Sequence, residues 1–181
     1  MIKDNKPIAK LHDLLDYNAQ KFTAAEIELR NSLPAWITQS NSMKLKNVLQ
    51  KYHDIVQQHI KRLESFFEEE KVTSLSVSNK IMQALIDETN EKLQSCSDSE
   101  VRDACLLASV QAINHFKISL YGTAAAFART LDMEKFAVLF HEAEVNEKQI
   151  DDRLSQLAEY EINNKAKAPI VLPCKKEKLM I

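Results

Sequence analysis

The chain has 181 residues and a formal net charge of −2 at pH 7, with 45% hydrophobic and 28% charged residues. Its length is that of one large domain, and the near-neutral charge disfavours nucleic acid as a partner, because nucleic-acid binders carry a basic face. One glycine and four prolines provide too little turn material for a β-sandwich or barrel. The composition therefore predicts an all-α protein with a full apolar core.

No apolar run approaches the roughly 18 residues that a membrane span needs, and the N-terminus lacks the apolar stretch of a signal peptide. The three cysteines, Cys96, Cys105 and Cys174, have no spacing typical of a metal site. Cys105 falls on a helix face and is interpreted as a small core residue. We therefore expect no membrane association and a cytoplasmic location, where thiols stay reduced.

Apolar residues at spacings of four or seven predict a first helix from about Pro7 to Thr38. Pro7 suits the first turn, because its missing N–H has no helical partner there. Pro34 lies inside the pattern and removes a backbone hydrogen bond, so we expect it to kink or end the helix just before Trp36.

A polar QSNS segment follows, in which Asn41 or Ser42 is expected to cap a second helix. This helix leads into an acidic run at residues 68–70 and then into a Ser/Thr-rich break. A third, shorter helix is predicted over about Asn79 to Gln94.

The pattern Ser97-x-x-Glu100 is that of a capping box and predicts the start of a fourth helix. This helix is rich in Ala and Ser, whose small side chains let neighbouring helices approach, so we expect it to be central. Asp132 is expected to cap a fifth helix. Helices of about 30 residues reach about 45 Å, the length of a long four-helix bundle. The bundle is assigned to residues 1–162 and a non-helical tail to residues 163–181.

Polar side chains interrupt the apolar pattern of every predicted helix. In chain order they are Glu26, His59, Glu88, His115 and Glu147. Carboxylates and imidazoles that point inward from facing helices build the di-iron and di-manganese sites of helical bundles. The chain has no Glu-x-x-His motif, however, and three acidic side chains are fewer than a dinuclear site uses. The alternative is that the glutamates reach solvent and the histidines are hydrogen-bonded core residues.

Five segments carry a resemblance to a known family: TAAEIELRNSLP, HIKRLESFF, ALIDE, QAINHFKISLYGTAAAFARTL and EVNEKQIDDRL. Over about residues 10–162 the chain resembles the YciE/YciF group of bacterial ferritin-like proteins. This resemblance implies a ferritin-like four-helix bundle with an additional short helix between the second and third bundle helices. It also implies a homodimer and an association with stress responses. The candidate or vestigial metal ligands are Glu26, Glu88, His115 and Glu147.

Some positions depart from the acidic pattern of that family. They are Asn114 and Lys117 in the fourth helix and Asn146 in the fifth. In the fifth helix Glu147 and Asp151 remain. An ammonium group at Lys117 near Glu26 and Glu147 would supply a fixed positive charge, and hard cations would then be repelled. The alternative for Lys117 is a surface lysine whose charged end reaches solvent.

These residues favour a ferritin-like protein without a cofactor, in which an interior ion-pair network replaces the di-metal site and His59, Tyr121 and Asp151 add further polar groups. We expect that such a protein is not an enzyme. The sequence does not identify its protein partner. The alternative is an altered, mononuclear site that binds iron or manganese and supports oxidoreductase-like activity. A third hypothesis is a bundle that binds a partner or an apolar ligand through Trp36 and Phe127.

Overall fold

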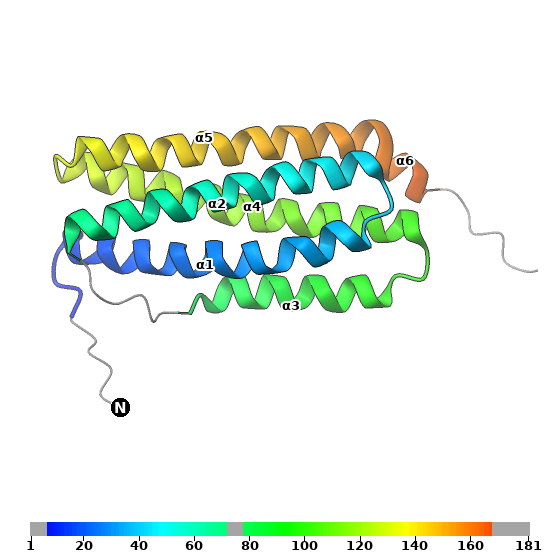
Figure 1. The fold of residues 1–181 in the computed structure, drawn as a ribbon, viewed down its shortest axis with the longest axis horizontal. Coiled ribbons are helices and arrows are strands. Elements are labelled where there is room, and N and C mark those ends of the chain that lie inside the picture. Colours follow the sequence, from blue (N-terminus) through cyan, green and yellow to red (C-terminus); the bar gives the residue numbers. More distant parts are fainter. Residues whose placement is uncertain (1–6, 72–77, 168–181) are drawn as a thin grey trace, which may run out of the picture.

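The computed structural model describes residues 7–71 and 78–167, and every regular element in these ranges is helical. Four long helices lie side by side (Figure 1). They are α1 (Leu11–Gln39), α2 (Met43–Glu70), α4 (Ser99–Thr130) and α5 (Glu134–Leu157). The shorter α3 (Lys80–Ser95) packs against α1 and α4. The expected all-α bundle with an additional short helix is therefore confirmed, and α4 contacts α1, α3 and α5, as expected of a central helix.

The start of α1 lies later than predicted. Pro7 precedes the helix, and Lys10 is the residue at its N-cap. The Asp13 carboxylate accepts hydrogen bonds from the backbone N–H groups of Ala9 and Lys10, at 3.2 Å each. An acidic side chain in the first turn satisfies N–H groups that have no helical partner, which makes Leu11 a more stable starting point than Pro7.

Pro34 does not end α1, because the helix continues to Gln39. The side chain of Trp36 is buried, and its indole N–H donates a hydrogen bond to Oδ1 of Asn90 on α3 at 2.9 Å. The Thr38 hydroxyl donates to the backbone carbonyl of Pro34 at 2.9 Å. Packing of the last turns outweighs the single backbone hydrogen bond that a proline removes.

Side-chain caps begin three of the helices. Ser42 accepts a hydrogen bond from the N–H of Leu45 at the start of α2, as expected, and Asn79 caps α3. The cap of α4 is Asp98 instead of Ser97, because Oδ1 of Asp98 accepts from the N–H groups of the next turn at 2.9 and 3.0 Å. A carboxylate is favoured there over a hydroxyl by the helix dipole.

Asp132 does not cap α5, whose N-cap is Met133. The connection from α4 to α5 is so short that Asp132 adopts a left-handed backbone conformation, with φ of 56°. Aspartate tolerates this conformation better than most residues, so its role here is to make the turn.

The predicted non-helical tail is wrong for its first residues. A π-helical turn, η1 (Ala158–Ile162), extends α5 and is followed by α6 (Asn163–Ala166). The buried Ile162 attaches this extension to the apolar core. Most of the predicted tail, residues 168–181, lies outside the described residues, as do residues 72–77 of the Ser/Thr-rich break.

A buried carboxylate joins the connection between α1 and α2 to α4. Asp103 of α4 is fully buried, and it accepts hydrogen bonds from the Ser40 hydroxyl (3.1 Å) and from the backbone N–H groups of Asn41 (2.8 Å) and Ser42 (2.6 Å). These backbone groups have no helical partner, so Asp103 supplies the acceptor that they need.

The apolar core consists of two clusters. One contains Leu29, Trp36, Leu49, Ile113 and Ile150, and the other contains Phe22, Leu63, Phe66, Tyr121 and Ala143. The first cluster contains residues nearer the α1–α2 connection, and the second contains residues nearer the opposite ends of those helices. Within residues 7–71 and 78–167, no helix combines the length and apolar content that crossing a membrane requires.

Candidate functional site

A polar layer lies at the middle of the bundle, between the two apolar clusters. Its members are Glu26 from α1, Tyr52 and His59 from α2, Asn114, Lys117 and Tyr121 from α4, and Glu147 from α5. None of these residues is more than 2% exposed. Intervals of three, four or seven residues keep side chains on one face of a helix, which is why the members from α2 and from α4 point inward together.

Lys117 is the centre of this layer. Its Nζ atom lies 2.9 Å from Oε2 of Glu26 and 2.6 Å from Oε1 of Glu147. Nζ also donates a hydrogen bond to the Tyr52 hydroxyl at 3.3 Å and lies 4.7 Å from the centre of the Tyr52 ring. The ammonium group thus joins α4 to three other helices.

Each carboxylate has further partners. The Tyr121 hydroxyl donates to Oε1 of Glu26 at 2.5 Å, and Nδ1 of His59 lies 3.1 Å from the same oxygen. Oε2 of Glu147 accepts from the Tyr52 hydroxyl and from the Asn114 amide, at 2.7 Å each. Buried polar groups are stable only when they are paired, and both carboxylates meet this requirement with several donors.

His59 lies between the two carboxylates. Its Nδ1 atom is 3.4 Å from Oε1 of Glu147, in addition to its contact with Glu26. Its other nitrogen, Nε2, lies 3.4 Å from Nδ2 of Asn146 at the half-buried edge of the layer. Asn146 thus contacts the layer through His59.

The surroundings favour the charged forms of these groups. Burial opposes ionisation of the Glu26 carboxyl, but Lys117 and His59 outweigh it and lower the pKa of this carboxyl from 4.5 to about 2. Burial also opposes a charge on Lys117, but Glu147 and Glu26 outweigh it, and the pKa of the ammonium is raised. The pKa of His59 is raised as well, because its hydrogen bonds to Glu147 and Glu26 outweigh burial.

The two tyrosines remain protonated. Burial and the nearby carboxylates raise the pKa of Tyr52 and of Tyr121 well above the usual value. Both hydroxyl groups are therefore hydrogen-bond donors at neutral pH. The layer then contains two acidic side chains, the Lys117 ammonium and a His59 ring whose surroundings favour the protonated form. Its negative and positive charges are therefore close to balanced.

The structure does not bring Glu88 or His115 into this layer. Glu88 is exposed on α3 and pairs with Lys92, with 2.5 Å between Oε1 and Nζ. The side chain of His115 is 64% exposed, and its Nε2 lies 3.0 Å from Oδ1 of Asp151. Neighbouring residues of a helix point about 100° apart, so the position next to Asn114 faces away from the interior. The expected inward positions of Glu88 and His115 are therefore wrong, whereas Asp151 is half-buried at the edge of the bundle, outside this layer.

Tyr52 was not among the predicted site residues, because it resembles an ordinary apolar residue in the pattern of α2. A signal for it exists: Tyr52 precedes His59 by seven residues and so lies on the same face of the helix. Trp36 and Phe127 do not line the cavity of about 700 Å³ between α3 and α4 in the described part of the chain. The hypothesis of a ligand bound by these two aromatic residues has no support from this cavity.

Within residues 7–71 and 78–167, two groups of side chains are close enough to share one metal ion. In the buried group, ligand atoms of Glu26, His59 and Glu147 lie within 4.8 Å of one another. A dinuclear carboxylate centre in a bundle uses about four glutamates and two histidines. Two carboxylates and one imidazole around the Lys117 ammonium do not fit such a centre.

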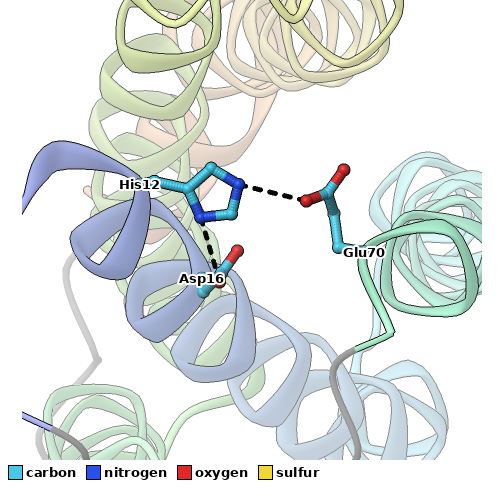
Figure 2. Close-up of side chains that lie close together, drawn as sticks. All are labelled: His12, Asp16 and Glu70. Atoms are coloured by element: carbon cyan, nitrogen blue, oxygen red, sulfur yellow. Dashed lines mark hydrogen bonds and ion pairs between the residues drawn. The ribbon is translucent and has the colours of Figure 1, made fainter.

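The second group, His12, Asp16 and Glu70, is half-buried where α1 begins and α2 ends. The imidazole lies between the two carboxylates (Figure 2). Its Nδ1 is 3.3 Å from Asp16, and its Nε2 is 3.1 Å from Glu70. Because the two nitrogens face different carboxylates, the ring connects α1 to α2. These three residues are not among those that the sequence patterns predicted to form a site.

Comparison with known proteins finds relatives over most of the chain. A family described as Domain of unknown function (DUF892) matches residues 10–167. Protein YciF of Escherichia coli strain K12 is 32% identical over 144 residues, which are 79% of this chain and 87% of YciF. Two solved structures have similar folds. The crystal structure of the E. coli stress protein YciF has a TM-score of 0.81 and 30% identity, over 89% of this chain and 100% of that one. YcfI of Rhodopseudomonas palustris has a TM-score of 0.80 and 26% identity, over 83% and 96% of the two chains.

Proposed function

The chain belongs to the DUF892 family, and from this premise we propose that it is a ferritin-like protein of the stress response in which an interior ion-pair network replaces a di-metal site. The relative YciF is described as a stress protein, which supports the stress-related role. The resemblance to the YciE/YciF group, inferred from sequence motifs, is confirmed by the match to YciF. In this proposal the protein is not an enzyme and acts through its surface.

The observation that carries the proposal is the position of Lys117. Its ammonium group contacts both buried carboxylates, at 2.9 and 2.6 Å. A divalent cation bound by Glu26 and Glu147 would lie beside this positive charge and would share the same oxygen atoms. Because like charges repel strongly where water is excluded, the network favours the metal-free form.

A homodimer and a cytoplasmic location are parts of the same proposal. They rest on the family resemblance and on the absence of a membrane-spanning helix from the described residues. Light scattering of the full chain tests the homodimer, and a monomer at micromolar concentration would contradict it.

Elemental analysis of the purified full chain tests the proposal. After chelation and reloading with iron, manganese or zinc, we expect no bound ion and no change in melting temperature. A variant with the substitutions Asn114→Glu and Lys117→Glu restores two acidic side chains to the layer and should gain metal. The matched control, Asn47→Glu with Lys61→Glu, makes the same changes at exposed positions. Metal bound by the unmodified chain with thermal stabilisation would overturn the proposal.

The second candidate function is metal binding at an altered, mononuclear site. It is favoured by the convergence of Glu26, His59 and Glu147 within 4.8 Å. Iron or manganese bound there would support oxidoreductase-like activity. The substitutions Glu26→Gln and Glu147→Gln separate the two functions. An ion-pair network would lose stability without any change in metal content, whereas a mononuclear site would lose its ion.

A further inference from the structure

A cavity of about 700 Å³ lies between the C-terminal end of α3 and the first turns of α4. Two cysteines line it together, and both are half-buried. Cys96 is the residue at the C-cap of α3, and Cys105 lies two turns into α4. The expected role of Cys105 as a core residue is therefore incomplete: it packs against the core on one side, and its thiol lines the cavity.

The two thiols interact in the reduced chain. Burial, followed by the charge and hydrogen bond of the neighbouring Cys96, raises the pKa of the Cys105 thiol. The Cys96 thiol donates a hydrogen bond to the backbone carbonyl of Lys92 at 3.2 Å. The backbone carbonyl of Cys96 accepts a hydrogen bond from the Arg102 guanidinium at 3.2 Å, and this bond connects the end of α3 to α4. The backbone around the pair is thus held in place before any covalent bond forms.

We propose that Cys96 and Cys105 are an oxidisable dithiol, which a hydroperoxide converts into a disulfide that joins α3 to α4. The shared cavity gives a small oxidant access to both sulfur atoms. Lys92 lines the same cavity, and its positive charge opposes the effect of burial on the pKa of the Cys105 thiol. A basic side chain beside an accessible thiol favours the thiolate, which is the form that reacts with peroxides.

One hydroperoxide oxidises the two thiols to one disulfide in two steps, in which atoms and electrons balance. The Cys96 thiolate attacks one peroxide oxygen, the O–O bond breaks, and the leaving hydroxide or alkoxide takes a proton. The Cys105 thiol then loses its proton and attacks the sulfenic sulfur of Cys96, and the S–O bond breaks with release of water. The thiols lose two electrons, which the peroxide gains. Cys105 is assigned the second step because burial and the neighbouring Cys96 raise the pKa of its thiol and so disfavour the thiolate that the first attack requires.

The disulfide would hold the end of α3 against the bundle. In the described chain α3 packs against α1 and α4. A covalent bond at its C-terminal end restricts its separation from α4. This makes the packing of α3 dependent on the oxidation state of the chain.

Peptide mapping of the full chain under non-reducing conditions tests the proposal. The reduced protein is treated with a few equivalents of hydrogen peroxide, blocked with an alkylating reagent and digested with trypsin. Cleavage after Lys92, Arg102 and Lys117 places the two cysteines in separate peptides, 93–102 and 103–117. We expect a cross-linked pair whose mass is lower by two hydrogens than the sum of the two peptides, and which dithiothreitol separates.

Three single variants complete the test. Cys174→Ser removes the third cysteine and is the matched control, which should form the same cross-link as the unmodified chain. Cys105→Ser should accumulate a sulfenic acid on Cys96 that dimedone traps, and Cys96→Ser should lose the cross-link. Hydrogen exchange should show slower exchange at the end of α3 in the oxidised control. Recovery of both peptides without a cross-link, or pairing of either cysteine with Cys174 instead, would overturn the proposal.

Discussion

The Nζ atom of Lys117 lies 2.6 Å from Oε1 of Glu147, and neither side chain is more than 1% exposed. Moving two charges out of water costs several kcal/mol for each ion, and their attraction offsets this cost only with good geometry and additional hydrogen bonds. Tyr52 and Asn114 provide such bonds to Glu147. The pair is therefore a weak contributor to net stability, but the loss of one partner is costly.

Replacing Lys117 by methionine should destabilise the fold by about 3 to 5 kcal/mol, which is the usual cost of removing one partner from a buried ion pair. The substitution keeps the volume of the side chain and leaves Glu26 and Glu147 without their shared cation. Urea unfolding at pH 7 measures the change. The same substitution at the exposed Lys61 is the control and should change the free energy of unfolding by less than about 0.5 kcal/mol. Equal effects at the two positions would contradict the central role of Lys117.

Stability should fall at acid pH because of Glu26. The pKa of its carboxyl is about 2 in the folded chain and 4.5 without these surroundings. The folded state therefore favours the ionised form. The contribution is complete above pH 4.5 and is lost as the pH falls towards 2, with a total on the order of 3 kcal/mol.

Urea unfolding between pH 5 and pH 2 measures this dependence. Glu26→Gln cannot ionise at this position, so its unfolding free energy should change less steeply over that range. The exposed Glu64→Gln is the control and should retain the slope of the unmodified chain. Parallel curves for the unmodified chain and Glu26→Gln would exclude Glu26 as the source.

Stability should also fall as the pH rises above 6.5 because of His59. Hydrogen bonds to Glu147 and Glu26 raise the pKa of its imidazole above 6.5 in the folded chain. The protonated ring thus stabilises the fold fully below pH 6.5, and this contribution is lost as the pH rises through the raised pKa. His59→Gln should flatten this loss, and His115→Gln, at an exposed position, should not. NMR titration of the imidazole checks the direction of the pKa shift directly.

Asp103→Ala should destabilise the fold by about 2 to 4 kcal/mol, because it leaves two backbone N–H groups and one hydroxyl without their acceptor. Asp103→Asn retains one acceptor oxygen and should have a smaller effect. The exposed Asp152→Ala is the control for the change of side chain. Thermal unfolding followed by circular dichroism gives the order of the three variants, and a larger loss for Asp152→Ala than for Asp103→Ala would contradict this role.

Helix number and most helix positions were predictable, because an apolar pattern with the period of a helix is a local property of the chain. The caps at Ser42 and Asn79 are local as well. The caps at Ser97 and Asp132 were assigned one residue too early. At α4 the neighbouring acceptors of Ser97 and Asp98 compete for the same N–H groups, and at α5 the left-handed conformation of Asp132 places it in the turn before the helix. The length of α1 beyond Pro34 depends on the contact of Trp36 with Asn90, which is distant in sequence.

The candidate site likewise contains residues that the sequence predicts and residues that it does not. Glu26 and Glu147 were inferred from their places in the helical patterns and Lys117 from its departure from the acidic pattern of the family, and the structure brings the three together. His115 was not predictable as a surface residue from a motif alone, because a shift of one position turns a side chain by about 100°. The role of Asp103 had no local signal, since its partners precede it by more than 60 residues.

The polar layer also determines the position of each long helix along its own axis, relative to the neighbouring helices. It separates two apolar clusters, whose contacts are non-directional and could be re-formed with other partners after a shift. A shift of α4 by one turn, about 5.4 Å, would instead carry the Lys117 ammonium away from Glu26 and Glu147 and break both of its buried ion pairs. The layer thereby selects one axial register for the four long helices, as a single buried polar residue does in a coiled coil.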